Sequence, residues 1–180
     1  DPARYDHRGT CDTAGATGYD CVMTDVHTVE QRSRNMSAIR HKNTRPEILI
    51  RSALHKKGFR FRVHRKDLPG KPDLVLPKYQ AAIFVNGCFW HGHGCHLFKW
   101  PKTRENFWKE KISGNVKRDA KNYQVLRELG FRFLIVWECA LKGSARLDRK
   151  MLITTISDWI VSGSPELEID GSESSPNVPI

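Results

Sequence analysis

Apolar residues recur along the middle of the chain in blocks whose spacing predicts alternating helices and strands. Three blocks have the period of an amphipathic helix: residues 45–57, a long stretch that begins at residue 105, and residues 149–161. Four blocks are short apolar or alternating runs typical of strands: residues 59–63, 74–76, 81–85 and 131–137. This order predicts an α/β fold of one domain, in which helices flank a mixed β-sheet.

Both ends of the chain lack this pattern. Residues 1–24 are rich in Gly, Thr and Asp, and residues 162–180 are rich in Ser, Pro and Glu without any Lys or Arg. We therefore expect a flexible leader and a disordered acidic tail around a domain at residues 25–161. Because the chain begins at Asp1 rather than Met, a fragment or a processed product is expected. Cys11 and Cys21 of the leader are assigned no role.

Positive charge is concentrated in the patterned region. Between Val26 and Lys150 there are 28 Lys and Arg residues against 10 Asp and Glu, a net charge of +18, whereas the whole chain carries +10. A domain this basic most often binds nucleic acid, with an anionic membrane surface as the second choice. No apolar run is long enough to span a bilayer, and the N-terminus has no signal-peptide core. A soluble, cytoplasmic protein is expected.

Residues 85–95, VNGCFWHGHGC, crowd metal-ligand side chains, aromatic rings and glycines directly after a predicted strand. Closely spaced Cys and His suit tetrahedral zinc, and Cys139, at the end of another strand, can complete a closed structural site. His91 and His96 compete for the histidine position, but the C-x₄-H-x-C spacing favours His93. The alternative is a set of buried free thiols with satisfied histidines. The predicted zinc ligands are Cys88, His93, Cys95 and Cys139.

A carboxylate and an imidazole are expected to meet beside this loop. Asp73 opens the strand that pairs with residues 81–85, and His91 follows that second strand. An Asp that holds Mg²⁺ and a neutral His that accepts a proton from water suit phosphodiester hydrolysis. The alternative for Asp73 is ordinary turn chemistry, and for Glu47 it is the capping box Thr44-Arg45-Pro46-Glu47. Phe89 and Trp90 either pack in the core or wedge between bases.

Five segments in order resemble the very-short-patch-repair (Vsr) mismatch endonucleases: RSRNMSAIR, TRPEILIR, LPGKPDLVLPKYQAAIFVNGCFWHGHGC, FWKEKISGNVKRD and LGFRFLIVWECAL. The resemblance covers residues 25–161. It implies a restriction-endonuclease-like fold and an Mg²⁺-dependent enzyme. Its implied activity is to nick one strand of DNA on the 5′ side of the thymine in a T·G mismatch, which arises by deamination of 5-methylcytosine. It also implies a monomer that acts on double-stranded DNA in the bacterial nucleoid, before other repair proteins.

The resemblance also implies roles for individual residues. Asp73 and the backbone carbonyl of Val85 become the Mg²⁺ ligands, His91 becomes the base, and Glu47 becomes a catalytic carboxylate near the metal. The zinc ligands are the four that spacing predicts. Asn86 departs from the family pattern, because some members have a histidine there. The implied DNA-binding residues are Phe89, Trp90 and Trp108, which enter the duplex, Met36, which grips it from the other groove, and Lys111 and Asn115 near the mismatch.

Two other functions remain open from the sequence. A zinc-braced module that binds distorted DNA without cutting it would leave Asp73 and His91 as turn and surface residues. A restriction-type nuclease would cut matched and mismatched duplexes equally. The flanking-sequence preference is not readable from the sequence.

Overall fold

The computed structural model describes residues 28, 30, 31, 34, 37 and 42–171 of the chain. The chain divides into two compact units, Asp1–Met36 and Ser37–Ile180. In the first unit, the Thr28 hydroxyl accepts a hydrogen bond from the Gln31 amide at 3.2 Å, and the Gln31 side chain accepts one from the Thr28 amide at 3.1 Å. This reciprocal pair is the signature of a helix start. The predicted leader and Met36 lie outside the described residues.

A five-stranded mixed sheet forms the centre of the second unit. Its strands β1 (Arg62–Val63), β2 (Leu74–Leu76), β3 (Ala81–Asn86), β4 (Arg132–Trp137) and β5 (Glu166–Ile169) lie side by side in sequence order. The pairs β1–β2 and β2–β3 are antiparallel, and β3–β4 and β4–β5 are parallel. The tight β2–β3 connection runs through a 3₁₀ turn, Pro77–Tyr79. The predicted mixed sheet is confirmed, although the first predicted strand is shorter than residues 59–63.

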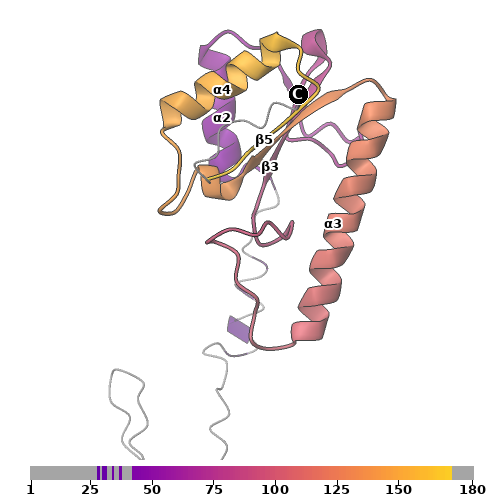
Figure 1. Cartoon of the computed structure of the whole chain (residues 1–180), viewed down its shortest axis with the longest axis vertical. Coiled ribbons are helices and arrows are strands. Elements are labelled where there is room, and N and C mark those ends of the chain that lie inside the picture. Colours follow the sequence, from indigo (N-terminus) through magenta and orange to yellow (C-terminus); the bar gives the residue numbers. More distant parts are fainter. Residues whose placement is uncertain (1–27, 29, 32–33, 35–36, 38–41, 172–180) are drawn as a thin grey trace, which may run out of the picture. The chain divides into compact units, whose positions relative to one another are not determined.

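Helices cover both faces of this sheet (Figure 1). Helices α2 (Arg45–Lys56) and α4 (Arg149–Ser162) lie on one face and α3 (Glu105–Glu128) lies on the other. The period of two along β4 explains this division. Leu134 and Val136 pack in the cluster that contains α2 and α4 residues, whereas the alternating residues Phe133, Ile135 and Trp137 pack with Leu126 of α3. The predicted α/β fold with helices on both faces is confirmed.

Helix α3 extends well beyond the sheet (Figure 1). The apolar stripe predicted for this helix is therefore only partly covered, and Val116 is 44% exposed. Ile112, on the same stripe, is buried. Both side chains lie beside Gly92 of the loop that follows β3. The projecting half of α3 is thus a support for that loop rather than for the sheet. Among the described residues, no helix is long and apolar enough to cross a membrane.

The C-terminal segment corrects the prediction of disorder from residue 162 onward. Helix α4 continues to Ser162, and β5 pairs with β4 in the register Phe133↔Glu166 to Val136↔Ile169. The sequence ELEI of β5 alternates, because Leu167 and Ile169 pack with the α2 and α4 cluster while the two glutamates lie on the other side. Its acidic composition concealed this period of two. Residues 172–180 lie outside the described part of the chain.

Arg132, the first residue of β4, ties the sheet to the end of α4. Its guanidinium donates to the carbonyl oxygens of Trp159 at 3.2 Å, Ile160 at 2.9 Å and Ser164 at 3.0 Å, and to that of Tyr79 at 3.1 Å. Trp159 and Ile160 are in the last turn of α4, where carbonyl groups have no partner within the helix. One side chain therefore caps α4 and joins it to the β2–β3 connection.

We predict that Arg132→Met lowers the free energy of unfolding by about 2–4 kcal/mol, because several partly buried carbonyl groups lose their donor at once. Urea unfolding followed by circular dichroism measures this loss. The matched control is Arg127→Met, which removes an exposed pair with Glu166 and should cost less than about 1 kcal/mol. Equal losses in the two variants would contradict the capping role of Arg132.

Candidate active site

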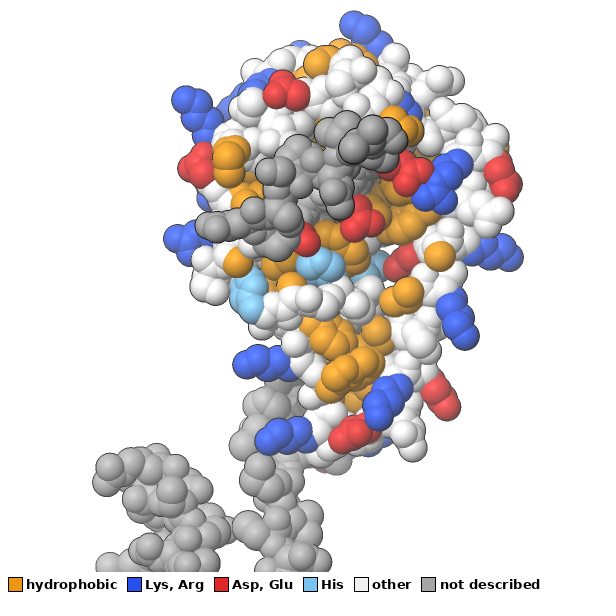
Figure 2. All heavy atoms as spheres, viewed as in Figure 1, with side chains coloured by type: hydrophobic (Ala, Val, Ile, Leu, Met, Phe, Trp, Pro, Cys, Tyr) orange, Lys and Arg blue, Asp and Glu red, His pale blue; other side chains and the backbone are white. Residues whose placement is uncertain are grey.

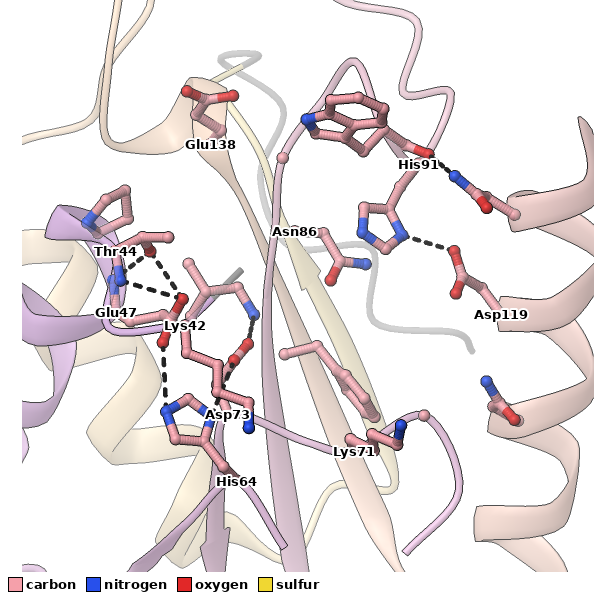
Figure 3. Close-up of a pocket in the computed structure, with 18 of the residues that line it drawn as sticks. Lys42, Thr44, Glu47, His64, Lys71, Asp73, Asn86, His91, Asp119 and Glu138 are labelled. Atoms are coloured by element: carbon pink, nitrogen blue, oxygen red, sulfur yellow. Dashed lines mark hydrogen bonds and ion pairs between the residues drawn. The ribbon is translucent and has the colours of Figure 1, made fainter. Parts of the chain in front are cut away.

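A cavity of about 750 Å³ opens between the start of α2, the ends of β2 and β3, and α3. Figure 2 shows histidine and apolar side chains in the middle of this side of the molecule, with lysine and arginine side chains around the margin. The charged groups inside the cavity come from separate elements, and Figure 3 shows Glu47, His64, Asp73, His91 and Asp119 pointing toward it. Its rim carries four exposed lysines: Lys42, Lys66, Lys71 and Lys111.

Asp73 is fixed by the strand next to it. One carboxylate oxygen, Oδ2, accepts a hydrogen bond from the Val85 amide at 2.8 Å, and the Asp73 amide donates to Ile83 O at 3.0 Å. Burial raises the pKa of Asp73 to about 6, against the lowering effect of the Val85 amide. The second oxygen, Oδ1, faces His64 at 3.9 Å. Burial therefore destabilises the ionised form of this carboxylate, which has one oxygen turned toward the cavity.

Glu47 forms the capping box that the sequence offered as one of its roles, and it also lines the cavity. Its amide donates a hydrogen bond to Thr44 Oγ1 at 3.5 Å, and its carboxylate accepts from the Thr44 amide at 3.3 Å and the Asn43 amide at 2.9 Å, which completes a capping box. Its carboxylate is also paired with Arg51. Yet ligand atoms of Glu47, His64 and Asp73 all lie within 4.8 Å of one another. The cap fixes a carboxylate that is only 3% exposed beside Asp73.

His64 is a site residue that sequence reasoning missed. Its Nδ1 faces Asp73, and its Nε2 lies 3.8 Å from Glu47 Oε2 and 3.0 Å from an Arg51 nitrogen. Burial, and then the charge of Arg51, lower the pKa of His64, which favours the neutral imidazole. Its position follows from the β1–β2 register, because Val63 pairs with Leu74 and the next pair outward is His64 with Asp73. The local sequence does not show this register, which is why His64 was missed.

His91 lies in the loop after β3 and is oriented by α3. Its Nδ1 is 2.6 Å from Asp119 Oδ2, so the carboxylate accepts the Nδ1 proton and leaves Nε2 with its lone pair. Asp119 was missed by sequence reasoning, although it follows Val116 by three residues and precedes Tyr123 by four on the packing stripe of α3. An acidic residue in such a stripe was the signal. Asn86, buried nearby, donates to the Tyr123 hydroxyl at 3.0 Å.

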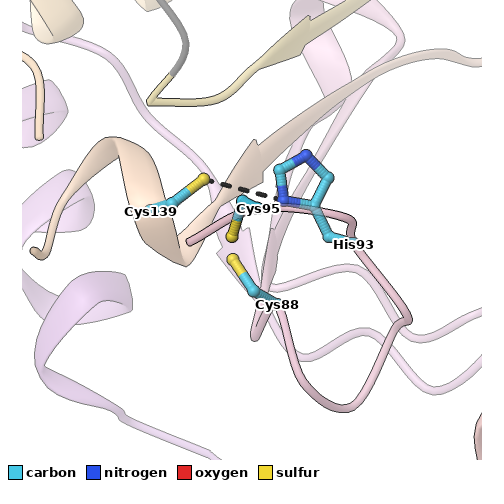
Figure 4. A group of neighbouring side chains, drawn as sticks. All are labelled: Cys88, His93, Cys95 and Cys139. Atoms are coloured by element: carbon cyan, nitrogen blue, oxygen red, sulfur yellow. Dashed lines mark hydrogen bonds between the residues drawn. The ribbon is translucent and has the colours of Figure 1, made fainter. Parts of the chain in front are cut away.

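A second cluster lies behind the cavity. Ligand atoms of Cys88, His93, Cys95 and Cys139 lie within 4.8 Å of one another (Figure 4). His93 is thereby chosen over its competitors, since His91 is paired with Asp119 and His96 lies against Gly143. Burial raises the pKa of the Cys88 and Cys139 thiols, and the described cysteines form no disulfide. Three thiols and one imidazole at this spacing fit a single tetrahedral zinc ion.

Aromatic side chains form a cluster on the same loop and on α3. The Phe89 ring lies 5.2 Å from Trp90 and 5.3 Å from Trp108 between centroids. All three are half-buried and belong to neither core cluster. Asn115 of α3 donates to the Trp90 carbonyl at 2.9 Å, which fixes the loop against the helix. The aromatic cluster therefore lies at the surface, beside the cavity.

The sequence is similar to those of several known proteins. Residues 24–97 match the family model described as DNA mismatch endonuclease Vsr. The chain is 47% identical over 148 residues to the DNA mismatch endonuclease Vsr of Escherichia coli strain K12, which covers 82% of this chain and 95% of that protein. The chain belongs to the Vsr family of DNA mismatch endonucleases.

Two further relatives are described as type II nicking enzymes. The chain is 46% identical over 129 residues to the type II nicking enzyme V.XorIIP of Xanthomonas oryzae pv. oryzae, covering 72% of this chain and 95% of that protein. It is 46% identical over 142 residues to the type II nicking enzyme V.NmeAIP of Neisseria meningitidis serogroup A, covering 77% of this chain and 100% of that protein. The Vsr family match at residues 24–97 contains Glu47, His64, Asp73 and His91.

We predict that Asp73→Asn stabilises the magnesium-free protein above pH 6. The pKa of Asp73 is raised in the folded protein from 3.8 to about 6, so the unfolded chain loses this proton first as pH rises. The stability of the wild-type protein then falls between about pH 4 and pH 6, and the full cost, roughly 2–3 kcal/mol, is present above pH 6.

Differential scanning calorimetry at pH 4.5 and pH 7.5, without added magnesium or chelator, measures this effect. The Tm of Asp73→Asn should exceed that of the wild type by roughly 5 °C or more at pH 7.5, and by about a third of that difference at pH 4.5. The control is Asp67→Asn, because Arg65 lowers the pKa of that exposed carboxyl and its replacement should give no gain. A lower Tm for Asp73→Asn at pH 7.5 would contradict the burial cost.

Proposed function

We propose that this protein is an Mg²⁺-dependent DNA endonuclease that nicks one strand on the 5′ side of the thymine in a T·G mismatch, the product of 5-methylcytosine deamination. The observation that carries the proposal is the convergence of two carboxylates, one buried and one partly buried, and two histidines in one lysine-rimmed cavity. Family membership supports a DNA mismatch endonuclease. The names of two relatives, type II nicking enzymes, support the cutting of a single strand.

The residues around Asp73 fit a divalent cation. Asp73 Oδ1 and the Glu47 carboxylate supply negative charge and neutral His64 adds a nitrogen beside them, and the Val85 carbonyl would be a further oxygen ligand. A buried carboxylate with a raised pKa gains stability when a cation neutralises it. When bound, Mg²⁺ would polarise the scissile phosphate and neutralise its developing charge. The rim lysines attract the DNA backbone by charge.

His91 is proposed as the general base. The pair with Asp119 holds the Nδ1 proton, so Nε2 is the atom that takes a proton from the attacking water. Asp119 then stabilises the imidazolium that forms, by the same hydrogen bond. Because Asp119 lies on α3 and His91 on the loop after β3, the base is in place only while loop and helix are packed together.

Zinc on Cys88, His93, Cys95 and Cys139 is proposed as structural, because four protein ligands leave no open position. Phe89, Trp90 and Trp108 are proposed to enter the duplex beside the mismatch, where exposed rings unstack and kink base steps. Lys111 and Asn115, which line the same cavity, are proposed to meet the DNA near the mismatch. Met36 remains a proposed DNA contact, and the protein is proposed to act as a monomer.

A nicking assay separates this function from the two others. Duplexes that differ only in one T·G or T·A pair, with varied flanking bases, are incubated with the protein and Mg²⁺ and resolved on denaturing gels. We expect a single nick 5′ of the mismatched thymine and none in the matched duplex. Equal cutting of both duplexes would indicate a nuclease for paired sites, and binding without any nick would indicate a DNA-binding module.

We predict that Asp119→Asn lowers the single-turnover nicking rate by about 10²–10⁴-fold, because the amide no longer fixes the His91 tautomer that leaves Nε2 free. His91→Gln should have a similar effect, and the double variant should be little worse than either, since the two residues act as one unit. Fluorescence anisotropy should find unchanged DNA affinity. Multiplicative losses in the double variant would show that Asp119 does not act through His91.

We predict that Phe89→Ala and Trp90→Ala weaken discrimination between T·G and T·A duplexes by roughly 10-fold or more, because stacking on a base contributes about 1–3 kcal/mol. The ratio of nicking rates on the two duplexes measures this. Thermal melting of each variant provides the control, because both rings lie outside the core clusters and should change Tm little. An unchanged ratio would remove these rings from mismatch recognition.

A further inference from the structure

The turn that follows β5 reaches the four-ligand cluster. The Gly171 amide donates a hydrogen bond to Cys139 Sγ at 3.3 Å, in a buried position. The Asp170 carboxylate lies 3.5 Å from His93 Nε2. One residue before the end of β5, Glu168 accepts from the Trp137 indole at 3.4 Å. Three residues of the segment Glu168–Gly171 thus contact two of the four candidate ligands and a neighbouring ring.

The position of Gly171 admits no side chain. A Cβ atom at this residue would lie 2.6 Å from the carbonyl oxygen of Ala145 and 2.7 Å from that of Cys139. Both atoms belong to the backbone, so neither can rotate away. Glycine is therefore required for the chain to come close enough to donate its amide to the Cys139 sulfur. The contact is built into the fold rather than left to a surface side chain.

The two nitrogens of His93 face different partners. Nδ1 lies 3.7 Å from Cys139 Sγ, inside the ligand cluster, and Nε2 points to Asp170. A carboxylate at Nε2 keeps the proton on that nitrogen and leaves Nδ1 as the ligand, an arrangement that commonly supports metal-bound histidines. The Trp137 ring stacks on His93 at 4.2 Å between centroids with an interplanar angle of 12°, and Glu168 holds that ring from β5.

We propose that the turn Asp170–Gly171 is the outer shell of the zinc site, so that zinc binding and the docking of β5 on β4 stabilise one another. Asp170 orients His93, and the Gly171 amide neutralises part of the negative charge of the Cys139 thiolate. This inference rests on the proposed zinc site. It gives the C-terminal strand a purpose beyond packing, because the strand delivers these two groups to ligands from the loop after β3 and the end of β4.

The variant Asp170→Asn tests the carboxylate. Zinc affinity is measured on the full chain by competition with a chromophoric chelator, and the spectrum of Co²⁺-substituted protein reports the geometry. We expect Asp170→Asn to weaken zinc binding by about 10–100-fold while the Co²⁺ spectrum stays tetrahedral. The matched control is Glu166→Gln, a carboxylate of the same strand that pairs with Arg127, which should leave zinc affinity unchanged.

These outcomes separate the two proposals. Purified wild-type protein that folds but binds no zinc would overturn the zinc site itself. Wild-type protein that holds one zinc, with Asp170→Asn binding it equally well, would overturn only the outer shell. Equal weakening in Glu166→Gln and Asp170→Asn would also overturn it, because the effect would then come from general charge.

Gly171→Ala tests the close approach of the backbone. We expect weaker zinc binding and a smaller rise of Tm on zinc addition than in wild-type protein, because the displaced turn no longer contacts Cys139. The control is Gly114→Ala, since a Cβ there meets nothing within 4 Å.

If Gly171→Ala does not fold, amide hydrogen exchange of the wild-type protein tests whether zinc binding and the docking of β5 are coupled. Zinc removal should speed exchange of the Leu167 and Ile169 amides more than that of β3, and equal acceleration would overturn the coupling.

Discussion

The convergence of Cys88, His93, Cys95 and Cys139 on one point is the constraint on which the rest of the site depends. Three of these residues lie in the glycine-containing loop after β3, and the fourth follows β4, the parallel neighbour of that strand. Within the loop, Cys88 and His93 enclose Phe89, Trp90 and His91 in sequence. A metal at this point would hold the proposed base, His91, and the aromatic rings by their own backbone, with α3 on the opposite side.

The cavity contains one carboxylate, Asp73, whose burial does not favour the folded state. Asp73 carries a pKa raised by burial, and Glu47 lies beside it with only a capping box and Arg51 to balance its charge. A module that only binds DNA has no need for such carboxylates, whereas a cation-dependent nuclease does. The stability lost at this site is offset elsewhere, by the continuous cores on the two faces of the sheet and by Arg132 at the end of α4. A catalytic cavity is expected to lower the stability of the fold locally, while packing elsewhere restores it.

The sequence predicted the features that depend on local spacing. The helices and the β2–β3 pair follow from periodicity, and the structure confirms them. Ligand spacing favoured His93, and the structure brings its ring close to the three cysteines. Contacts that depend on register or on long-range packing were missed. His64 meets Asp73 through the β1–β2 register, Asp119 meets His91 across 28 residues, and Asp170 meets His93 only because β5 joins the sheet. Strand β5 was missed because its segment is acidic, and acidic composition is typical of solvated chain. The alternation of Leu167 and Ile169 with glutamates was the pattern that indicates a packed strand.

The most direct test of the zinc-braced active site is the single-turnover rate of nicking on a T·G duplex as zinc is removed and restored. Zinc is stripped from the full chain by a chelator, the chelator is removed, and Mg²⁺ is held in excess throughout. Nicking should fall in proportion to the zinc lost and return when one equivalent is added back, because His91 is presented by the metal-held loop. Zinc-free protein that nicks the mismatched duplex at the full rate would contradict the account.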